Sequence, residues 1–333
     1  MYKTKMSFFA LLLAVTTAQV YAQGASGFKL VNTYKIASSG GWDYIALHSG
    51  RIYVSHGTQV NILDQQSGDS LGVIPGTTGV HGIAFVESLG KGYTSNGRLN
   101  NITVFDLKTN AVLKQIPVGE NPDAIMYEEF TKKLITCNGR SHDLSIVDPV
   151  TESVVTTIPL SGKPETAVSD GAGKLYVNIE DKNLISVVDL KTNAVLNSWP
   201  IAPGEGPTGL AIDVKTKRLF AGCDKLLMVL DAGDGHVVAK VPIGDGCDGV
   251  AFDDGLKYIF ASCGEGKLSI VEEVSANQFN SKDDVATQRG ARTITIDKEK
   301  HQVFMPTASF GTAVAGERPQ MIGGTFRVLV VSR

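Results

Sequence analysis

Short apolar runs separated by polar turn residues recur along the chain after its first two dozen residues. Between residues 123 and 159 the runs read DAIMYEE, KLITCN, DLSIVD and VVTTIP, with Gly, Asn, Asp or Lys-Thr residues between them. Runs of about four to seven residues rich in Val, Ile, Leu and aromatic side chains are typical of strands. No stretch beyond the first two dozen residues keeps a helical apolar stripe for three turns. The pattern therefore predicts an all-β protein.

These runs repeat with a period of 41 or 42 residues. The octet DLKTNAVL occurs at 106–113 and again at 189–196. An aspartate closes one apolar run in each of five units: Asp64, Asp106, Asp148, Asp189 and Asp231. A proline follows at the same interval: Pro75, Pro117, Pro159, Pro200 and Pro242. Since proline cannot donate to a strand ladder, we place it on the outer edge of each sheet. Four antiparallel strands in such a unit form the blade of a β-propeller.

The repeat count predicts seven blades in a single domain over residues 23–333. Their inner strands are expected to start near residues 41, 80, 121, 163, 206, 246 and 291. The last blade lacks a fourth strand, because the run FRVLVVSR at the end of the chain is its third. The segment 28–36 (FKLVNTYKI) has the period of an outer strand, and we expect it to complete blade seven and close the ring.

The amino-terminal segment has the pattern of a signal peptide. Lys3 and Lys5 precede an apolar run from Phe8 to Val15, and small residues follow up to Ala22. That run is far shorter than the ~20 residues that span a bilayer. We therefore expect cleavage after Ala22 and a periplasmic or secreted protein without a membrane span.

Composition narrows the range of partners. The chain has 333 residues, a formal net charge of −3 and only 2 Trp. Its pI of about 6.1 leaves no excess of basic residues to neutralise a phosphate backbone, which counts against nucleic acid. We expect a monomer that binds a small ligand or a protein at the mouth of the channel.

The repeat sequences resemble those of a known family. The segment KLYVNIEDKNLISVVDLKTNAVL, with IYVS and GYTSN elsewhere, is similar to the repeats of YVTN-type, or YncE-like, β-propeller proteins, which are WD40-like in architecture. GARTITID and the ending GTFRVLVVSR also resemble that family. The resemblance implies the seven-bladed fold and an exported or surface location. It transfers no catalytic residue.

One ring of polar positions is expected at the mouth of the channel, where the inner strands begin. The predicted ligand-binding residues there are Asp43, His81, Asp123, Glu165, Thr208, Asp248 and Arg292, with Gly82 at the equivalent place in blade two. The main expectation is that these residues hold no metal or cofactor and that none is catalytic, because a water-filled channel is itself lined by polar groups. The alternative is a divalent cation such as calcium, held by the carboxylates Asp43, Asp123, Glu165 and Asp248.

The six histidines divide between the two faces of the ring. Three are expected in solvated turns on the far face: His48, His236 and His301. Three are expected toward the mouth, namely His56, His81 and His142, and a metal site that uses His56 and His81 lacks a clear third ligand. His81 is the alternative catalytic residue, as an acid or a base.

Cysteine positions leave three possibilities open. Folding the hairpin about Gly255 brings Cys247 opposite Cys263, and Cys223 lies at the matching place one blade earlier. An exported protein favours a disulfide, either Cys247–Cys263 or Cys223–Cys247. The third possibility is that all remain buried thiols, as expected for Cys137.

Blade seven carries an insertion at 307–324, which we expect to overhang the mouth and contact a ligand or partner.

The sequence contains no CxxCH haem motif, adjacent cysteine pair or phosphate-binding glycine loop, which counts against redox and nucleotide chemistry. Binding without catalysis is the main expectation. The alternative is a metal-assisted, lactonase-like hydrolase or lyase at the acidic channel.

Overall fold

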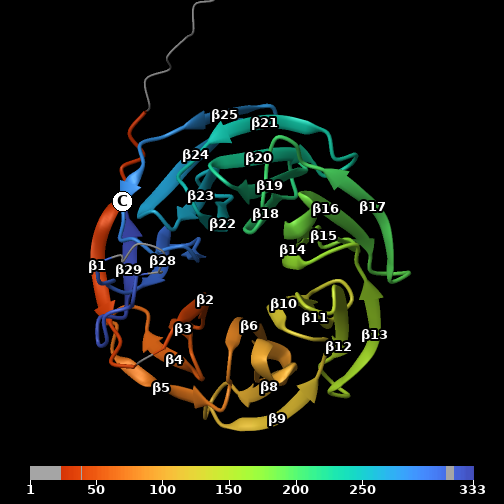
Figure 1. The fold of residues 1–333 in the computed structure, drawn as a ribbon, viewed down its shortest axis with the longest axis vertical. Helices are drawn as coiled ribbons and strands as arrows, with labels where there is room; N and C mark the ends of the chain where they lie inside the picture. Colours follow the sequence, from red (N-terminus) through yellow and green to blue (C-terminus); the bar gives the residue numbers. More distant parts are fainter. Residues whose placement is uncertain (1–23, 39, 313–318) are drawn as a thin grey trace, which may run out of the picture.

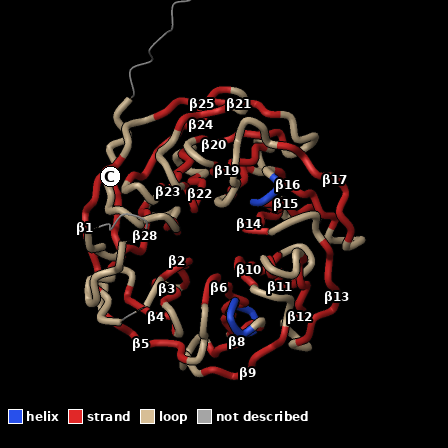
Figure 2. The backbone as a smooth tube through the Cα atoms, in the orientation of Figure 1, coloured by secondary structure: helices blue, strands red, loops and turns tan. Residues whose placement is uncertain are grey.

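The computed structural model describes residues 24–38, 40–312 and 319–333. Seven antiparallel sheets are arranged as a ring, and the strands of each sheet follow one another from the centre to the rim (Figure 1). The helical residues described form three short 3-10 turns, η1 (Glu87–Leu89), η2 (Gly97–Leu99) and η3 (Glu180–Lys182) (Figure 2). The all-β, seven-bladed prediction is confirmed. The predicted signal peptide lies outside the described residues.

The first three blades contain only consecutive strands, ordered from the centre outward. Blade one has β2 (Trp42–His48), β3 (Arg51–His56), β4 (Gln59–Asp64) and β5 (Ser70–Pro75). Blade two has β6 (Val80–Val86), β7 (Lys91–Asn96), β8 (Asn101–Asp106) and β9 (Val112–Pro117). Blade three has β10 (Pro122–Glu128), β11 (Lys133–Asn138), β12 (Asp143–Asp148) and β13 (Ser153–Pro159).

Blades four to six continue the same order. Blade four has β14 (Pro164–Ser169), β15 (Lys174–Ile179), β16 (Leu184–Asp189) and β17 (Ala194–Pro200). Blade five has β18 (Leu210–Asp213), β19 (Arg218–Cys223), β20 (Leu226–Asp231) and β21 (Val237–Pro242). Blade six has β22 (Cys247–Asp253), β23 (Tyr258–Cys263), β24 (Lys267–Ser275) and β25 (Gln278–Ser281), and the short β26 (Val285–Ala286) also pairs with β24.

Blade seven is built from both ends of the chain. It contains β27 (Thr295–Asp297), β28 (Gln302–Thr307), β29 (Arg327–Ser332) and, outermost, β1 (Lys29–Lys35). In Figure 1 the red first strand lies beside the blue last strand. Their antiparallel register places Leu30 opposite Val331 and Lys35 opposite Arg327. The predicted closure of the ring by residues 28–36 is therefore confirmed.

The repeated Asp and Pro residues have separate local roles. In blades one to five, the Asp at the end of the third strand accepts hydrogen bonds from backbone amides of the following turn, as Asp106 does from Lys108 and Thr109. The Pro ends the outermost strand of five blades, where no further strand needs its missing N–H. The repeat period is visible in the sequence because the Asp shapes the turn after the third strand and the Pro ends the outer strand.

Apolar side chains are buried mainly between neighbouring blades. One core cluster joins blades one and two and includes Tyr53, Ile62, Ile83 and Phe105. Another joins blades seven and one and includes residues of β1, β28 and β29. The core is thus divided among blade interfaces, which leaves the ends of the inner strands free for polar residues. Within the described residues, no helix has the length and apolar character needed to cross a membrane.

Two inner strands begin later than the sequence predicts. In blade five the strand starts at Leu210 rather than near 206, and in blade seven it starts at Thr295 rather than near 291. Ahead of these strands, the amide of Thr208 donates to the carbonyl of Gly222 at 3.0 Å, and the hydroxyl of Thr293 donates to the carbonyl of Asp43 in blade one. As a result, Thr208 and Arg292 lie in the loops that lead into their strands.

Candidate functional site at the channel mouth

Polar side chains of one blade hold the start of the next inner strand at the mouth. Ser95 donates its hydroxyl hydrogen to the carbonyl of Asp123, and Ser262 does the same for Arg292. Thr293 Oγ1 donates to the carbonyl of Asp43 at 2.5 Å, so the same kind of hydrogen bond links blade seven to blade one. The backbone beneath the predicted ring is therefore fixed from blade to blade.

Five of the predicted ring residues form one continuous chain of charged contacts. Arg292 pairs with Asp248, and its Nη2 lies 3.3 Å from Oδ1 of Asp43. Oδ2 of Asp43 lies 2.5 Å from Nδ1 of His81. The same nitrogen lies 3.7 Å from Oδ1 of Asp123. The chain runs through blades six, seven, one, two and three.

The other predicted positions take different roles. Thr208 donates its hydroxyl hydrogen to the carbonyl of Cys247 at 2.6 Å, so it joins two blades. Glu165 pairs with Lys163 at 3.0 Å. Gly82 lets two inner strands approach closely, because a Cβ there would lie 2.8 Å from the amide nitrogen of Ile125. The sequence could not show which ring side chains face their neighbours and which turn to the backbone.

Burial and like charges alter the protonation of this site. Burial raises the pKa of Asp123 to about 8, and the charge of Glu165 acts in the same direction. Burial also lowers the pKa of His81, but the hydrogen bond to Asp43 and the charges of Asp123 and Glu165 outweigh it, so the pKa is raised overall. Burial raises the pKa of Glu165, against the effect of Lys163. The site therefore favours any cation or proton that relieves its negative charge.

Tyr44, which sequence reasoning missed, lies across the centre of the ring. Its hydroxyl in blade one lies 3.5 Å from the hydroxyl of Thr166 in blade four. Burial raises the pKa of Tyr44 well above its ordinary value, and the carboxylates Asp123, Glu165 and Asp43 add to the effect. A cavity of about 110 Å³ beside the ring is lined mainly by apolar residues, including Ile125 and Met126. An alternating strand pattern does not reveal such a contact across the axis.

A larger cavity of about 630 Å³ opens at the mouth. Its lining is mostly polar or glycine, and comprises Gly40, Gly41, Trp42, Asp43, Gly57, Thr58, Gly79, Val80, His81, Arg98, Asn121 and Arg292. Arg98 is exposed and, among the residues that the structure describes, has no ion-pair partner, whereas Arg292 is held by Asp43 and Asp248. Gly79 has a φ of +69°, and a Cβ there would lie 2.6 Å from Cγ of Arg98. The glycine therefore makes room for the arginine at the rim.

His56 has a structural role and does not join His81. Its Nε2 donates to the carbonyl of Gly40 at 2.8 Å, and its Nδ1 lies 2.5 Å from Oγ of Ser38. Its ring stacks on Phe326 with centroids 3.8 Å apart. These contacts tie blade one to the end of blade seven. They occupy both ring nitrogens, which argues against the two-histidine metal site.

The far-face histidines are less solvated than predicted. His48 stacks on Phe85 at 4.4 Å and lies 2.6 Å from a carboxylate oxygen of Glu87. His301 Nδ1 lies 2.7 Å from Oδ2 of the buried Asp253. His236 is exposed and pairs with Asp234. The expectation of free solvation is wrong for His48 and His301, because neighbouring blades supply acidic partners that a single repeat does not reveal.

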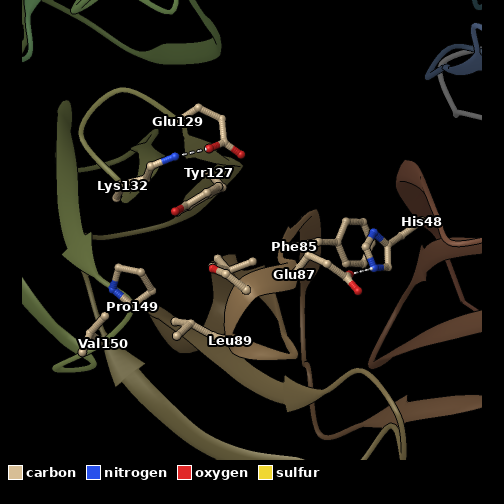
Figure 3. Close-up of a pocket in the computed structure, with 11 residues that line it drawn as sticks. His48, Phe85, Glu87, Leu89, Tyr127, Glu129, Lys132, Pro149 and Val150 are labelled. Atoms are coloured by element: carbon tan, nitrogen blue, oxygen red, sulfur yellow. Dashed lines mark hydrogen bonds and ion pairs between the residues drawn. The ribbon is translucent and has the colours of Figure 1, made fainter.

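The cavity on the far face is about 640 Å³ and lies between blades one, two and three (Figure 3). Figure 3 shows Leu89, Tyr127, Pro149 and Val150 around it, with the His48–Glu87 pair at one side and the Glu129–Lys132 pair at another. Each of these ionisable side chains already has a partner, because His48 lies 2.6 Å from Glu87 and Lys132 lies 2.6 Å from Glu129. This cavity therefore offers mainly shape and apolar surface, in contrast to the charged mouth.

Cysteine placement follows the sequence expectation. Cys247 and Cys263 are direct partners in the β22–β23 ladder, and Cys223 is near enough to influence Cys247 electrostatically. All four cysteines are buried free thiols in the structure, Cys137 included. The hydrogen bond between Cys247 and Cys263 raises the pKa of Cys247, with burial adding to it, and lowers that of Cys263. Formation of a disulfide stays a prediction.

The described part of the 307–324 insertion lies next to the mouth. Phe310 forms a β-bridge with Met321, and its ring lies 5.9 Å from that of Trp42, which lines the mouth cavity. Residues 313–318 lie outside the described residues. The position fits the expectation that this insertion borders the site.

Comparisons with known proteins bear on the fold alone. No family model matches the chain, and no curated protein matches it either. Among solved structures, the chain is similar to one in hydrazine synthase from Kuenenia stuttgartiensis, with a TM-score of 0.71 and 14% sequence identity. The alignment covers 80% of this chain and 92% of the other. This likeness shows the propeller architecture.

Proposed function

We propose that this chain is an exported, monomeric binding protein that holds a small organic carboxylate in the 630 Å³ mouth cavity. The signal-peptide pattern at 1–22 supports export to the periplasm or beyond, and the YVTN-type repeats support a place among YncE-like propellers. The cavity lies within the volume range of about 300–1,000 Å³ that is typical of small-molecule sites.

One observation carries the choice of ligand. Arg98 lines the cavity and has no acidic partner among the described residues. A guanidinium group donates paired hydrogen bonds that match a carboxylate. Arg292 differs because Asp43 and Asp248 already take its charge. Arg98 is therefore the anchor, and Asn121 and His81 offer further polar contacts along the wall.

Calorimetric titration tests this proposal with succinate, glutamate and benzoate as probes. At least one is expected to bind with a Kd below about 1 mM, which corresponds to about 4 kcal/mol. Arg98→Gln is expected to weaken that binding about tenfold or more, because a hydrogen bond to a charged group is worth about 1.5–3 kcal/mol. Arg140→Gln is the matched control, since Arg140 occupies the corresponding loop of blade three and does not line the cavity.

Two results would contradict the proposal. One is the absence of binding for all three probes. The other is equal binding by the wild-type chain and Arg98→Gln, which would place the probe elsewhere. A similar loss in Arg140→Gln would indicate a general charge effect at the mouth in place of a defined anchor.

A further inference from the structure

We propose that Asp43, His81 and Asp123 form a binding site for one divalent transition-metal ion, with Zn²⁺ as the expected occupant. The inference goes beyond the carboxylate site and rests on different observations, although Asp43 and His81 also line that cavity. The three side chains start from adjacent inner strands in blades one, two and three. They supply one imidazole nitrogen and two carboxylate groups.

The ligand atoms are already close to the spacing that a metal requires. One atom from each residue lies within 4.8 Å of the other two. Nδ1 of His81 lies 2.5 Å from Oδ2 of Asp43 and 3.7 Å from Oδ1 of Asp123. Zinc bonds of about 2.0–2.2 Å separate neighbouring ligands by about 3.3–3.6 Å in tetrahedral geometry. Side-chain shifts of about 1 Å would satisfy this spacing.

The environment of Asp123 is an independent indication that the cluster binds a metal ion. Its side chain is nine-tenths buried, with 10% of its surface exposed. Its Oδ1 faces His81 but has no hydrogen-bond partner among the described residues. A buried carboxylate oxygen without a partner carries a desolvation cost that a metal ion offsets. The orphaned atom is the one that the geometry assigns as a ligand.

The surrounding charges and the donor set determine the class of metal. Glu165 adds negative charge beside Asp123, whereas Arg292 and Lys163 oppose it from the two sides. An imidazole ligand suits zinc and similar metals, while calcium prefers six to eight oxygen ligands. Three protein ligands leave a position for water or for another small ligand. The donor set therefore favours Zn²⁺ over the calcium ion considered from sequence.

Equilibrium dialysis of the purified, untagged chain with Zn²⁺ or Ca²⁺ tests the site in the absence of carboxylate probes. One Zn²⁺ per chain is expected to depend on this cluster, and Ca²⁺ is expected to bind more weakly. Asp123→Asn and His81→Gln should each weaken Zn²⁺ binding more than about 100-fold, because even supporting residues around a metal contribute 10–100-fold. His236→Gln is the matched control, since His236 belongs to an exposed acidic cluster on the far face.

Circular dichroism and melting temperature confirm that each variant is folded before its binding is read. Anomalous scattering from a Zn²⁺-soaked crystal of the unaltered chain locates the ion without any substitution. The proposal is overturned by the absence of bound Zn²⁺, by tighter binding of Ca²⁺, or by loss of binding in His236→Gln but not in His81→Gln. An anomalous peak away from these three residues would overturn it as well.

Discussion

The hydroxyl groups of Tyr44 and Thr166 lie 3.5 Å apart, although the two residues belong to blades one and four. Tyr44 therefore spans the centre of the ring just below the charged mouth. The same tyrosine lines the small cavity that also contains Ile125 and Met126. The floor of the mouth is built by a contact across the axis as well as by neighbouring blades.

Tyr44→Ala is expected to lower the free energy of unfolding by about 1–3 kcal/mol, because it removes a ring that packs against blades three and four. Tyr44→Phe keeps that packing and loses one long hydrogen bond, so its cost should stay below about 1 kcal/mol. Chemical denaturation measures both values. Equal losses in the two variants would show that the hydroxyl, and not the ring, supplies the contribution.

Stability should decrease in mild acid because of His56. Burial lowers its pKa, against the hydrogen bonds to Gly40 and Asn61. The unfolded chain then binds a proton more readily than the folded chain, so the contribution is complete above about pH 6.5 and is lost as the pH falls below it. The slope from one such group is at most about 1.4 kcal/mol per pH unit.

Urea denaturation at pH 7.5 and pH 5.5 tests this expectation. His56→Gln should show a smaller difference between the two pH values than the wild-type chain, whatever its absolute stability. The other five histidines are the same in both proteins, so comparison of the two slopes isolates His56. An unchanged slope would mean that His56 keeps its ordinary pKa.

Gly97 is expected to control the position of His81. A Cβ at residue 97 would lie 2.7 Å from Nε2 of His81 and 2.8 Å from Oδ1 of Asn121. Gly97→Ala should therefore displace the imidazole and weaken Zn²⁺ binding about tenfold or more, while the melting temperature changes little. Gly323→Ala is the control, since a Cβ there meets no atom within 4 Å. Equal affinity in both variants would contradict the positioning role.

Oxidation is expected to join Cys247 to Cys263. Directly opposed residues in an antiparallel ladder have Cα atoms about 4.5–5.5 Å apart, within the range that a disulfide spans. Oxidised glutathione would take up the two electrons and two protons that the thiols lose. Mass mapping of unreduced peptides should then find this bridge, with Cys137 and Cys223 still free. A Cys223–Cys247 bridge, or four free thiols after oxidation, would contradict the prediction.

Much of the architecture was predictable because it repeats. The Asp and Pro positions recur in five blades and mark turns and edges, so their spacing predicts the blades, and the unmatched run at 28–36 predicts the closure. Five ring residues also met as expected, since inner strands start at one face. The roles of Tyr44 and Arg98 were not predictable. They depend on the width of the channel and on loop conformations that no repeat period encodes.

The account rests on closure of the ring by β1, because that closure brings Asp43 in blade one to Arg292 in blade seven. Hydrogen exchange measured by mass spectrometry tests it most directly, in the unaltered chain. The β1 amides that are hydrogen-bonded to β29 should exchange as slowly as the paired amides of β29, because both open only when blade seven opens, whereas the outward-facing β1 amides exchange freely. Exchange of the paired β1 amides at the rate of the exposed loops, with β29 still protected, would contradict the account.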